Sequence, residues 1–198
     1  MGNPLGVLNK SVTSNYGAIS TSSNFENLKY IGPATPTFFG SIRNSISYKQ
    51  VTVSANVTYK LGYYFRRRSV SYSFSTFGSD IHPDYFLRWQ KPGDEYLTNV
   101  PSMVYPVNQS RDNFYAASEI LAEKGDHVRL QDIQFTYDLV KENFKKLPFR
   151  SVQLYVYLNN LGILWRANEH NIDPDFNPGA TDVFPNPKTY AIGMNINF

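Results

Sequence analysis

Oxygen-bearing side chains near the end of the chain have a spacing that invites comparison with a calcium-binding loop. The four residues are Asp173, Asp175, Asn177 and Asp182. An EF-hand loop needs glycine at its sixth position for a sharp turn and a bidentate glutamate at its twelfth. Pro178 and Phe184 occupy those positions here. The sequence therefore predicts a solvated, turn-rich loop and no metal site.

No other group of residues has the spacing of a catalytic site. The three histidines, His82, His127 and His170, are far apart and lack a neighbouring nucleophile or ligand pattern, and the chain has no cysteine. A net charge of +3 over 198 residues is too small and too dispersed to indicate nucleic-acid binding. We therefore expect a protein that is not an enzyme and that uses no cofactor.

Aromatic residues in the least regular stretches are weak candidates for substrate binding. Tyr85, Trp89 and Trp165 have rings that could stack on the apolar faces of sugars, or that could pack the loops against each other. Tyr155 and Tyr157 alternate with apolar residues and so lie on the polar face of a predicted strand. On a transport channel that face would line the lumen, where both tyrosines would contact substrate or a plug.

Three consecutive arginines, Arg66, Arg67 and Arg68, follow a predicted strand directly. A guanidinium group binds phosphate oxygens bidentately, so one interpretation is contact with lipopolysaccharide phosphates at an outer-membrane surface. The other interpretation is the solvated start of a loop.

These candidates depend on strands to position them, and the alternation of apolar and polar residues predicts five. The predicted strands cover about 37–48, 51–64, 127–139, 151–160 and 188–198. Val51, Val53 and Val57 alternate with polar residues over about thirteen positions, whereas a tilted membrane-spanning strand needs about 9–11. Leu130 breaks the alternation in the third strand, which predicts a β-bulge near Asp132.

The connections between these strands alternate strictly between short and long. Tight turns are expected near Tyr48 and Lys145, and long loops at 65–126 and 160–186, with a further loop over 1–36 and a short helix or turn at 116–124. Outer-membrane barrels have short periplasmic turns and long extracellular loops. The sequence thus predicts an all-β fold, an antiparallel transmembrane β-barrel segment of about five strands with long extracellular loops.

Composition agrees with a membrane barrel. Apolar residues make up 41% and charged residues 18% of the chain, which includes 15 tyrosines and 14 phenylalanines. Tyrosine suits membrane interfaces, because one end of its ring is apolar and the other polar. No apolar run is long enough for a transmembrane helix, and barrel strands give no such run because they alternate.

The last ten residues form the most regular strand pattern. Tyr190, Ile192, Met194, Ile196 and Phe198 alternate with small or polar residues. A strand that ends the chain on an aromatic residue is typical of the last strand of an outer-membrane barrel, where it carries a signal for barrel assembly. Gly193, Ile196 and Phe198 are the candidates for that signal. An ordinary terminal strand of a soluble sandwich is the alternative.

Several stretches together resemble the C-terminal part of SusC/RagA-type TonB-linked outer-membrane proteins of Bacteroidetes. Two of the matching stretches are Arg-Trp-Gln-Lys-Pro-Gly-Asp-Glu at 88–95 and Lys-Gly-Asp-His-Val-Arg-Leu-Gln-Asp-Ile at 124–133, and 36–49, 99–103, 151–160 and 185–198 also match. The resemblance implies a barrel of about 22 strands with a plugged lumen. It also implies import of glycans or peptides across the outer membrane, with a SusD-like lipoprotein as lid and TonB as the energy source.

The chain departs from that family in what is missing. No plug, TonB box or earlier barrel strand is visible, and Ala191 stands where the family's terminal signal usually has a polar residue. Five strands cannot close a barrel, so we expect this chain to be the C-terminal portion of a longer protein that contacts TonB through its missing N-terminal region. The rival hypothesis is a secreted β-sandwich that binds carbohydrate, with its apolar faces packed between two sheets.

Overall fold

The computed structural model describes residues 2–22, 24–73, 82–142, 144–145, 148–176 and 186–198. The chain forms two compact units. The first, here called the mixed unit, consists of Met1–Gly32 and Phe65–Glu123. The second, here called the sheet unit, consists of Pro33–Tyr64 and Lys124–Phe198.

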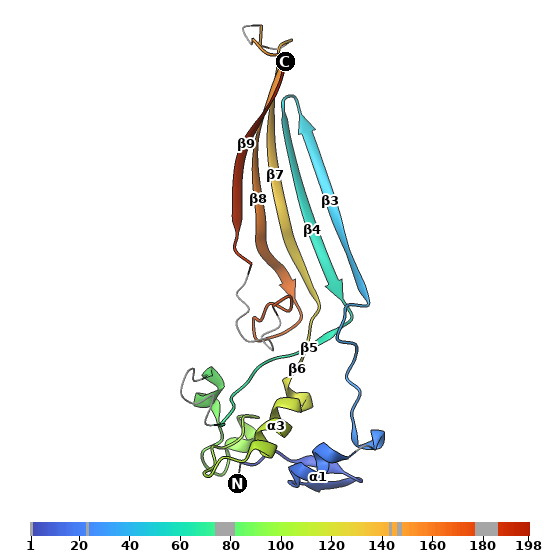
Figure 1. Cartoon of the computed structure of the whole chain (residues 1–198), viewed down its shortest axis with the longest axis vertical. Helices are drawn as coiled ribbons and strands as arrows, with labels where there is room; N and C mark the ends of the chain where they lie inside the picture. The colour runs from blue at the N-terminus through green and yellow to red at the C-terminus, as the bar shows by residue number, and fades with distance from the viewer. Residues whose placement is uncertain (1, 23, 74–81, 143, 146–147, 177–185) are drawn as a thin grey trace. The chain divides into compact units, whose positions relative to one another are not determined.

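The sheet unit contains one antiparallel sheet of five strands in the order β3–β4–β7–β8–β9 (Figure 1). The strands are β3 (Phe38–Tyr48), β4 (Val51–Leu61), β7 (His127–Val140), β8 (Ser151–Arg166) and β9 (Thr189–Asn197). The all-β class and the antiparallel pairing are therefore confirmed. Strand β8 continues six residues beyond the expected end at 160, whereas β4 stops at Leu61 instead of 64.

Strand register confirms the expected irregularity in β7. Asn56 pairs with Asp132 and the next residue, Val57, pairs with Leu130, so Gln131 has no partner on β4. This extra residue is a β-bulge, and it restores the apolar residues of β7 to one face after Leu130 has broken the alternation. The β3–β4 turn is the tight connection expected after Tyr48, with Lys49 in the left-handed conformation at φ 55°.

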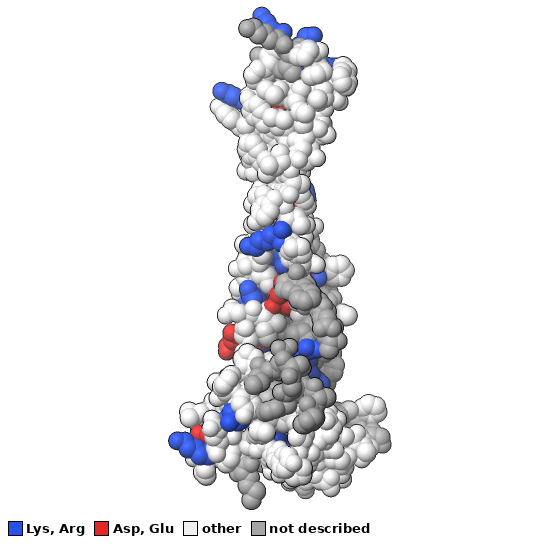
Figure 2. Space-filling model, turned by 60° about the vertical axis from the view of Figure 1, so that its left-hand side comes forward, with Lys and Arg blue, Asp and Glu red and all other residues white. Residues whose placement is uncertain are grey.

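One face of the sheet is apolar across all five strands. A row near its middle consists of Ile46, Val53, Phe135, Val156 and Ile192. The outer members of the row are strongly exposed, with Ile46 at 71% and Ile192 at 84% of full accessibility. Figure 2 shows few charged groups over the upper part of the sheet unit in its view, and more of them lower down. The sheet unit thus presents its apolar residues outward.

The opposite face is polar and contains the buried residues of the described strands, except for Val152, which lies on the apolar face and is 8% exposed. Ser54, Arg129, Asp132 and Thr136 are all less than a tenth exposed. In a water-soluble sheet with one covered face, apolar side chains are expected to be the buried ones. Here the polarity of the two faces is reversed.

The second layer that a β-sandwich requires is not found in the described parts of the chain. The other sheets there have two short strands each: β1 (Gly6–Leu8) with β2 (Ser11–Thr13), and β5 (Tyr64–Arg66) with β6 (Ala122–Lys124). Val53 and Leu154, which a sandwich would bury between two layers, remain 40% and 41% exposed.

The mixed unit has more structure than the predicted loops. Its helical elements are α1 (Tyr16–Thr21), η1 (Phe25–Asn27), η2 (Pro83–Leu87), η3 (Asp94–Tyr96), α3 (Gln109–Ala117) and η4 (Glu119–Leu121). The prediction of a featureless loop over 1–36 was wrong, because that stretch holds a small hairpin and a helix. The helix expected at 116–124 begins earlier, since the Asn108 side chain caps α3 by accepting a hydrogen bond from the Arg111 backbone N–H at 3.1 Å.

A small core of the usual kind stabilises the mixed unit. Its buried members are Val70, Tyr72, Val100, Tyr115 and Leu121, with Tyr85 packed against them. No helix among the described residues combines the length and the apolar character needed to cross a membrane.

Candidate functional site on the polar face of the sheet

Charged groups in the middle of the polar face form a closed network. The Arg43 Nη2 group donates to both Asp132 carboxylate oxygens, at 2.9 and 3.0 Å, and the Asn56 side-chain amide donates to the second oxygen at 3.0 Å. Asp132 is only 2% exposed. The bulge at Gln131 places Asp132 on this face, so the buried carboxylate is matched by a cation and an amide.

A second, larger charge cluster lies where β4 and β7 meet the loop that follows β8. The Arg129 Nη2 group donates to both oxygens of Asp173 at 2.6 Å. Asp175 lies 2.6 Å from Lys60 Nζ and 3.3 Å from His127 Nε2. Burial raises the pKa of Asp175, but the hydrogen bonds and charges of His127 and Lys60 outweigh burial and hold that pKa well below its usual value.

This cluster explains the carboxylates that resembled a calcium loop. Asp173 and Asp175 are bound to cationic side chains of the sheet, and Asn177 and Asp182 lie outside the described residues. Asn168 orders the start of the same loop, since its amide donates to the Ile172 carbonyl and accepts from the Ile172 N–H. Among the described residues, no group of three or more His, Asp or Glu side chains could hold a metal ion.

A hollow of about 290 Å³ opens on the polar face beside this cluster. Its lining is mostly polar: Arg129, Gln131, Asn159, Asn160, Asp175, Phe176, Asn186, Pro187 and Thr189. Arg129 is 5% exposed, and its Nε has no hydrogen-bond partner in the described structure. The lining is bonded internally: the Arg129 Nη1 group donates to Asn160 Oδ1 at 3.0 Å, and the Gln131 amide donates to Asn159 Oδ1 at 3.1 Å.

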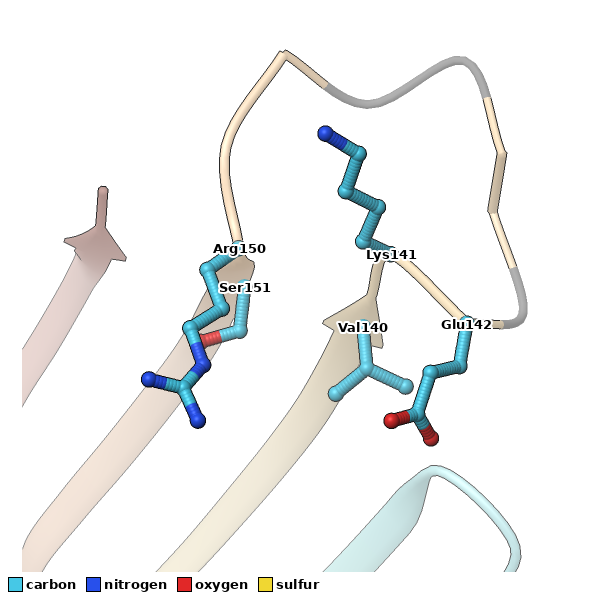
Figure 3. A pocket seen from close by; sticks show the side chains of 5 residues that line it. All are labelled: Val140, Lys141, Glu142, Arg150 and Ser151. Carbon is cyan, nitrogen blue, oxygen red and sulfur yellow. The ribbon is translucent and has the colours of Figure 1, made fainter.

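A second hollow, of about 450 Å³, lies at the turn between β7 and β8 (Figure 3). It is lined by Val140, Lys141, Glu142, Arg150 and Ser151. Figure 3 shows the charged ends of Lys141, Glu142 and Arg150 pointing away from one another. Because these charges do not converge on one point, this hollow lacks the geometry of a binding site.

The two tyrosines predicted to face a lumen are on the polar face. Tyr157 pairs with Gln134, and Tyr155 pairs with Thr136 and Gly193. The Tyr155 ring lies over Gly193, where an added Cβ would come within 2.3 Å of the ring. Gly193 therefore has a packing role across the β8–β9 pair, in addition to the assembly role proposed from its position.

Trp165 was expected in a loop, but the structure places it in β8. It pairs with Val128 on the apolar face and is 51% exposed. Sugar stacking in a lumen requires a ring on the other face. The prediction of a loop residue was wrong because the alternation is disturbed near Gly162, where β7 and β8 slip in register.

Tyr85 packs inside the mixed unit. Its ring makes edge-on contacts with Tyr72 and Phe86, at centroid distances of 6.4 and 5.7 Å. The Arg88 guanidinium lies 4.0 Å from the ring centroid. This is the loop-packing geometry that was the alternative to sugar stacking.

Trp89 also makes contacts within the mixed unit. Its indole N–H donates to Glu95 at 3.0 Å and its backbone N–H donates to the Val100 carbonyl at 3.0 Å. The backbone of Gly2 lies so close that an added Cβ would meet the indole ring at 2.5 Å. A sugar-binding role for Trp89 stays a prediction.

The three consecutive arginines differ in environment. Arg67 is turned inward, with a side chain 12% exposed, and pairs with Asp84 at 2.7 Å and with Glu123 at 3.6 Å. This internal pairing argues against lipopolysaccharide contact through Arg67. Arg66 and Arg68 are exposed, and for them phosphate contact stays a prediction.

The chain ends with an exposed aromatic residue. Ile196 lies opposite Val152, whereas Phe198 follows the end of β9 and is 91% exposed. The Phe198 ring makes an edge-on contact with Phe149, with centroids 5.2 Å apart. Whether Gly193, Ile196 and Phe198 act as an assembly signal stays a prediction.

Sequence reasoning did not identify the residues that build the polar-face clusters. Arg43, Lys60, His127, Arg129 and Asp132 each occupy a polar position within a strand. The signal available in the sequence was the presence of charged residues of both signs at polar positions of the predicted strands. Partners from different strands, however, become visible only when the register is known.

Comparison with solved structures shows the same fold in a transporter. The chain superposes on "Structure of the RagAB peptide importer in the 'open-open' state" with a TM-score of 0.64 and 19% identity, over all of this chain and 21% of that one. On the structure of the same importer in the 'closed-closed' state, the TM-score is 0.62 and the identity is 21%, over 96% of this chain and 20% of the importer chain. The chain therefore spans about a fifth of the length of these transporter chains. No family model matches the sequence, and no curated protein does either.

Proposed function

We propose that this chain forms part of the wall and the outer loops of an outer-membrane nutrient importer of the SusC/RagA type. The observation that carries the proposal is the reversed polarity of the five-stranded sheet, whose apolar face bears strongly exposed side chains such as Ile46 and Ile192 while its polar face holds buried charged ones such as Arg129 and Asp132. That polarity suits a wall with hydrocarbon outside and a polar lumen inside. The shared fold with the RagAB importer supports it.

Aromatic rows at both ends of the apolar face support a membrane position. At the turn end, Tyr48 and Tyr137 flank Val51 in register; at the loop end, Tyr59 and Trp165 flank Val128. The rows are eight residues apart along β4, about 27 Å at about 3.4 Å per residue. A strand tilt of about 40° reduces this distance to a little over 20 Å, near the apolar band of about 25 Å in such barrels.

Strand lengths agree with the same position. The five strands have 11, 11, 14, 16 and 9 residues, and crossing a bilayer takes about 9–11. In such a barrel Trp165 belongs to the interfacial aromatic girdle. The polar face then lines the path of a glycan or peptide.

The same proposal implies partners outside this chain. The importer would work with a SusD-like surface lipoprotein and draw energy through TonB, as the family resemblance implies. Its role would be transport without catalysis.

Single-cysteine labelling tests the proposal: these 198 residues contain no cysteine, and any cysteine elsewhere in the full-length protein is replaced by serine. Cysteine is placed at Ile192 or Val53 on the apolar face, and at the exposed positions Asn195 or Ser47 on the polar face, in the full-length protein in cells. Bilayer lipid should quench a fluorophore at Ile192 and leave one at Asn195 unquenched. A water-soluble maleimide should label the polar-face positions preferentially after the membrane is opened.

Two results would contradict the proposal. Extraction of the full-length protein into buffer without detergent would favour the sandwich. Equal lipid quenching at Ile192 and Asn195 would show that the two faces do not border different media.

A further inference from the structure

Exposed basic residues from two separate turns lie at the turn end of the sheet unit. Lys49 is in the β3–β4 turn, and Lys141, Lys145 and Arg150 are in the β7–β8 turn. The register of β3, β4, β7 and β8 brings both turns to the same end of the sheet. Figure 2 shows Lys and Arg side chains at the top of the sheet unit in its view.

These four cations lack acidic partners. None of them takes part in an ion pair within the described structure, whereas Lys60 and Arg129 at the loop end each pair with a carboxylate. Glu142 is the one exposed acidic residue that the structure describes at the turn end. Asp138 is half-buried there and accepts a hydrogen bond from the Gln153 amide at 2.8 Å. The turn end therefore has an excess of positive charge.

Aromatic rings accompany the basic residues. Phe144 is 37% exposed and Phe198 is 91% exposed, and the Phe149 ring contacts Phe198 with centroids 5.2 Å apart. The Lys49 ammonium group lies 5.3 Å from the centroid of the Tyr48 ring. Rings mixed with basic side chains are typical of segments at a membrane–water interface, where long basic side chains reach the headgroups.

The basic residues begin where the apolar face of the sheet ends. Leu139 lies on that face, and two positions further on, the Lys141 backbone N–H donates to the Arg150 carbonyl at 3.1 Å. Lys49 directly follows Tyr48 of the aromatic row. The charged ends of Lys141 and Arg150 point away from one another (Figure 3). Cations spread in this way suit a layer of phosphate groups better than one bound ion.

We propose that the turn end binds the headgroups of anionic phospholipids, with Lys49, Lys141, Lys145 and Arg150 contacting phosphate oxygens. A guanidinium group binds phosphate bidentately, and an ammonium group binds it as a point charge. Each basic side chain close to an anionic membrane surface favours binding by about fivefold. The inference rests on the proposed function, which puts hydrocarbon against the apolar face, and it adds a lipid partner in the periplasmic leaflet.

Quenching by brominated lipids tests the inference in the full-length protein reconstituted into phosphatidylcholine vesicles. Increasing fractions of the lipid are replaced by acyl-brominated phosphatidylglycerol or, in a matched series, by acyl-brominated phosphatidylcholine. A fluorophore is attached to a single cysteine at Leu139, near the turn end of the apolar face, or at Val128, near its loop end. Comparison of the two series gives the relative affinity of the two lipids at each position.

Three double variants separate charge from structure. Lys141→Gln with Arg150→Gln removes two charges from the turn end, and Lys141→Arg with Arg150→Lys keeps both charges there. Lys124→Gln with Lys188→Gln is the matched control, because it removes two charges from exposed positions at the loop end.

Phosphatidylglycerol should be preferred about fivefold or more at Leu139 and not at Val128, in low salt. The preference should fall to less than half in Lys141→Gln/Arg150→Gln and weaken at about 0.5 M salt. The charge-keeping variant and the loop-end control should retain it.

Three results would overturn the lipid site. They are equal affinity of the two lipids at Leu139, the same preference at both reporters, and an undiminished preference in Lys141→Gln/Arg150→Gln. The two reporters on the otherwise unchanged protein decide the question even if a variant fails to fold. Lipid quenching at Ile192 and Asn195 decides the importer proposal separately. A barrel wall whose turn end binds an acidic protein would pass that test and fail this one.

Discussion

The two units of this chain stabilise their structures in opposite ways. The mixed unit is built around a small cluster of buried apolar residues that includes Tyr72 and Leu121. The sheet unit buries Arg129 and Asp132 and leaves Ile192 outside. Under the proposed function, this difference reflects two surroundings, water around the mixed unit and hydrocarbon against the apolar face of the sheet unit.

Buried charges appear in both units, but their surroundings differ. In the mixed unit, Arg111 is 2% exposed and bonds to the Gly2 and Ser102 carbonyl oxygens and to the Asn3 side chain. These bonds hold the start of the chain against a distant segment. In the sheet unit, Asp132 is paired with Arg43 across three strands. Such pairs keep a polar face ordered without an apolar core.

The largest expected effect comes from a charge on the apolar face. Ile192→Lys places an ammonium group in the middle row of that face, where a bilayer would cost it about 2–4 kcal/mol. The amount of folded full-length protein in the membrane fraction should fall severely. Immunoblotting of membrane fractions, with and without boiling, measures that loss.

Asn195→Lys provides the matched comparison on the polar face of the same strand. It should assemble normally, since the proposed wall has its polar face toward water. Ile192 is 84% exposed, and lysine at so exposed a position on a soluble protein changes stability by only about 0.5 kcal/mol. Equal accumulation of Ile192→Lys and Asn195→Lys would therefore show that the apolar face of the sheet unit borders water, as the surface of the mixed unit does.

The next largest effect is expected in the mixed unit. Arg111→Met removes the bonds to Gly2, Asn3 and Ser102 and leaves Asp112 buried, at an expected cost of about 3 kcal/mol. Hydrogen exchange should accelerate in α3 and near Ser102, while β3 and β4 keep their protection. Gln109→Ala, on the same helix at an exposed position, is the control. Loss of protection in both units together would show that they are not separately stabilised.

The sequence predicted the sheet unit far better than the mixed unit, for a physical reason. A strand whose two faces border different surroundings must alternate apolar and polar residues. The positions of Val51, Val53 and Val57 therefore identify β4 without further information. The bulge followed from the break at Leu130. The end of β8 was missed because register slips near Gly162 disturb the same signal.

The mixed unit depends on contacts that no local pattern encodes. Its core joins Val70 and Tyr72 to Val100 and Tyr115, residues far apart in sequence. The polar hollow was missed for a similar reason, since Arg129 and Asn159 share it only through the pairing of β7 with β8. The sequence of one strand shows which residue types it carries. Which of them lie next to residues of other strands can be known only from the register between the strands.

A smaller effect separates packing from assembly at the last strand. Gly193→Ala brings a methyl group into the Tyr155 ring, which can shift at an expected cost of about 1–2 kcal/mol. Tyr155→Ala should restore stability to the Gly193→Ala variant if packing is the reason for glycine. Thermal unfolding of the four proteins of this double-mutant cycle measures the coupling. A defect in barrel assembly that persists in the double variant would instead support a role for Gly193 in the proposed C-terminal assembly signal.

The smallest effect is expected from pH in the mixed unit. Burial raises the pKa of Asp84, but hydrogen bonds from Ser69 and Arg67 outweigh burial, and the net shift is downward. A carboxyl with a lowered folded pKa stabilises the fold above its unfolded value of about 4, and that contribution is lost as the pH falls through the folded pKa. Acidification from neutral pH to about 3 should therefore lower the protection factors of the amides in this unit, measured as exchange rates relative to the slower intrinsic exchange at each pH.

Asp84→Asn should reduce that acid sensitivity at the expense of stability at neutral pH, because the Arg67 cation then loses a partner. Burial raises the pKa of Asp112, so protonation of that carboxyl in acid favours the folded state and opposes the effect of Asp84. Asp112 is present in both the wild type and Asp84→Asn, so its contribution cancels when the two are compared. Glu119→Gln is the control, since the Lys29–Glu119 pair is exposed and weak. Identical acid profiles for the wild type and Asp84→Asn would show that the Asp84 cluster does not stabilise the mixed unit.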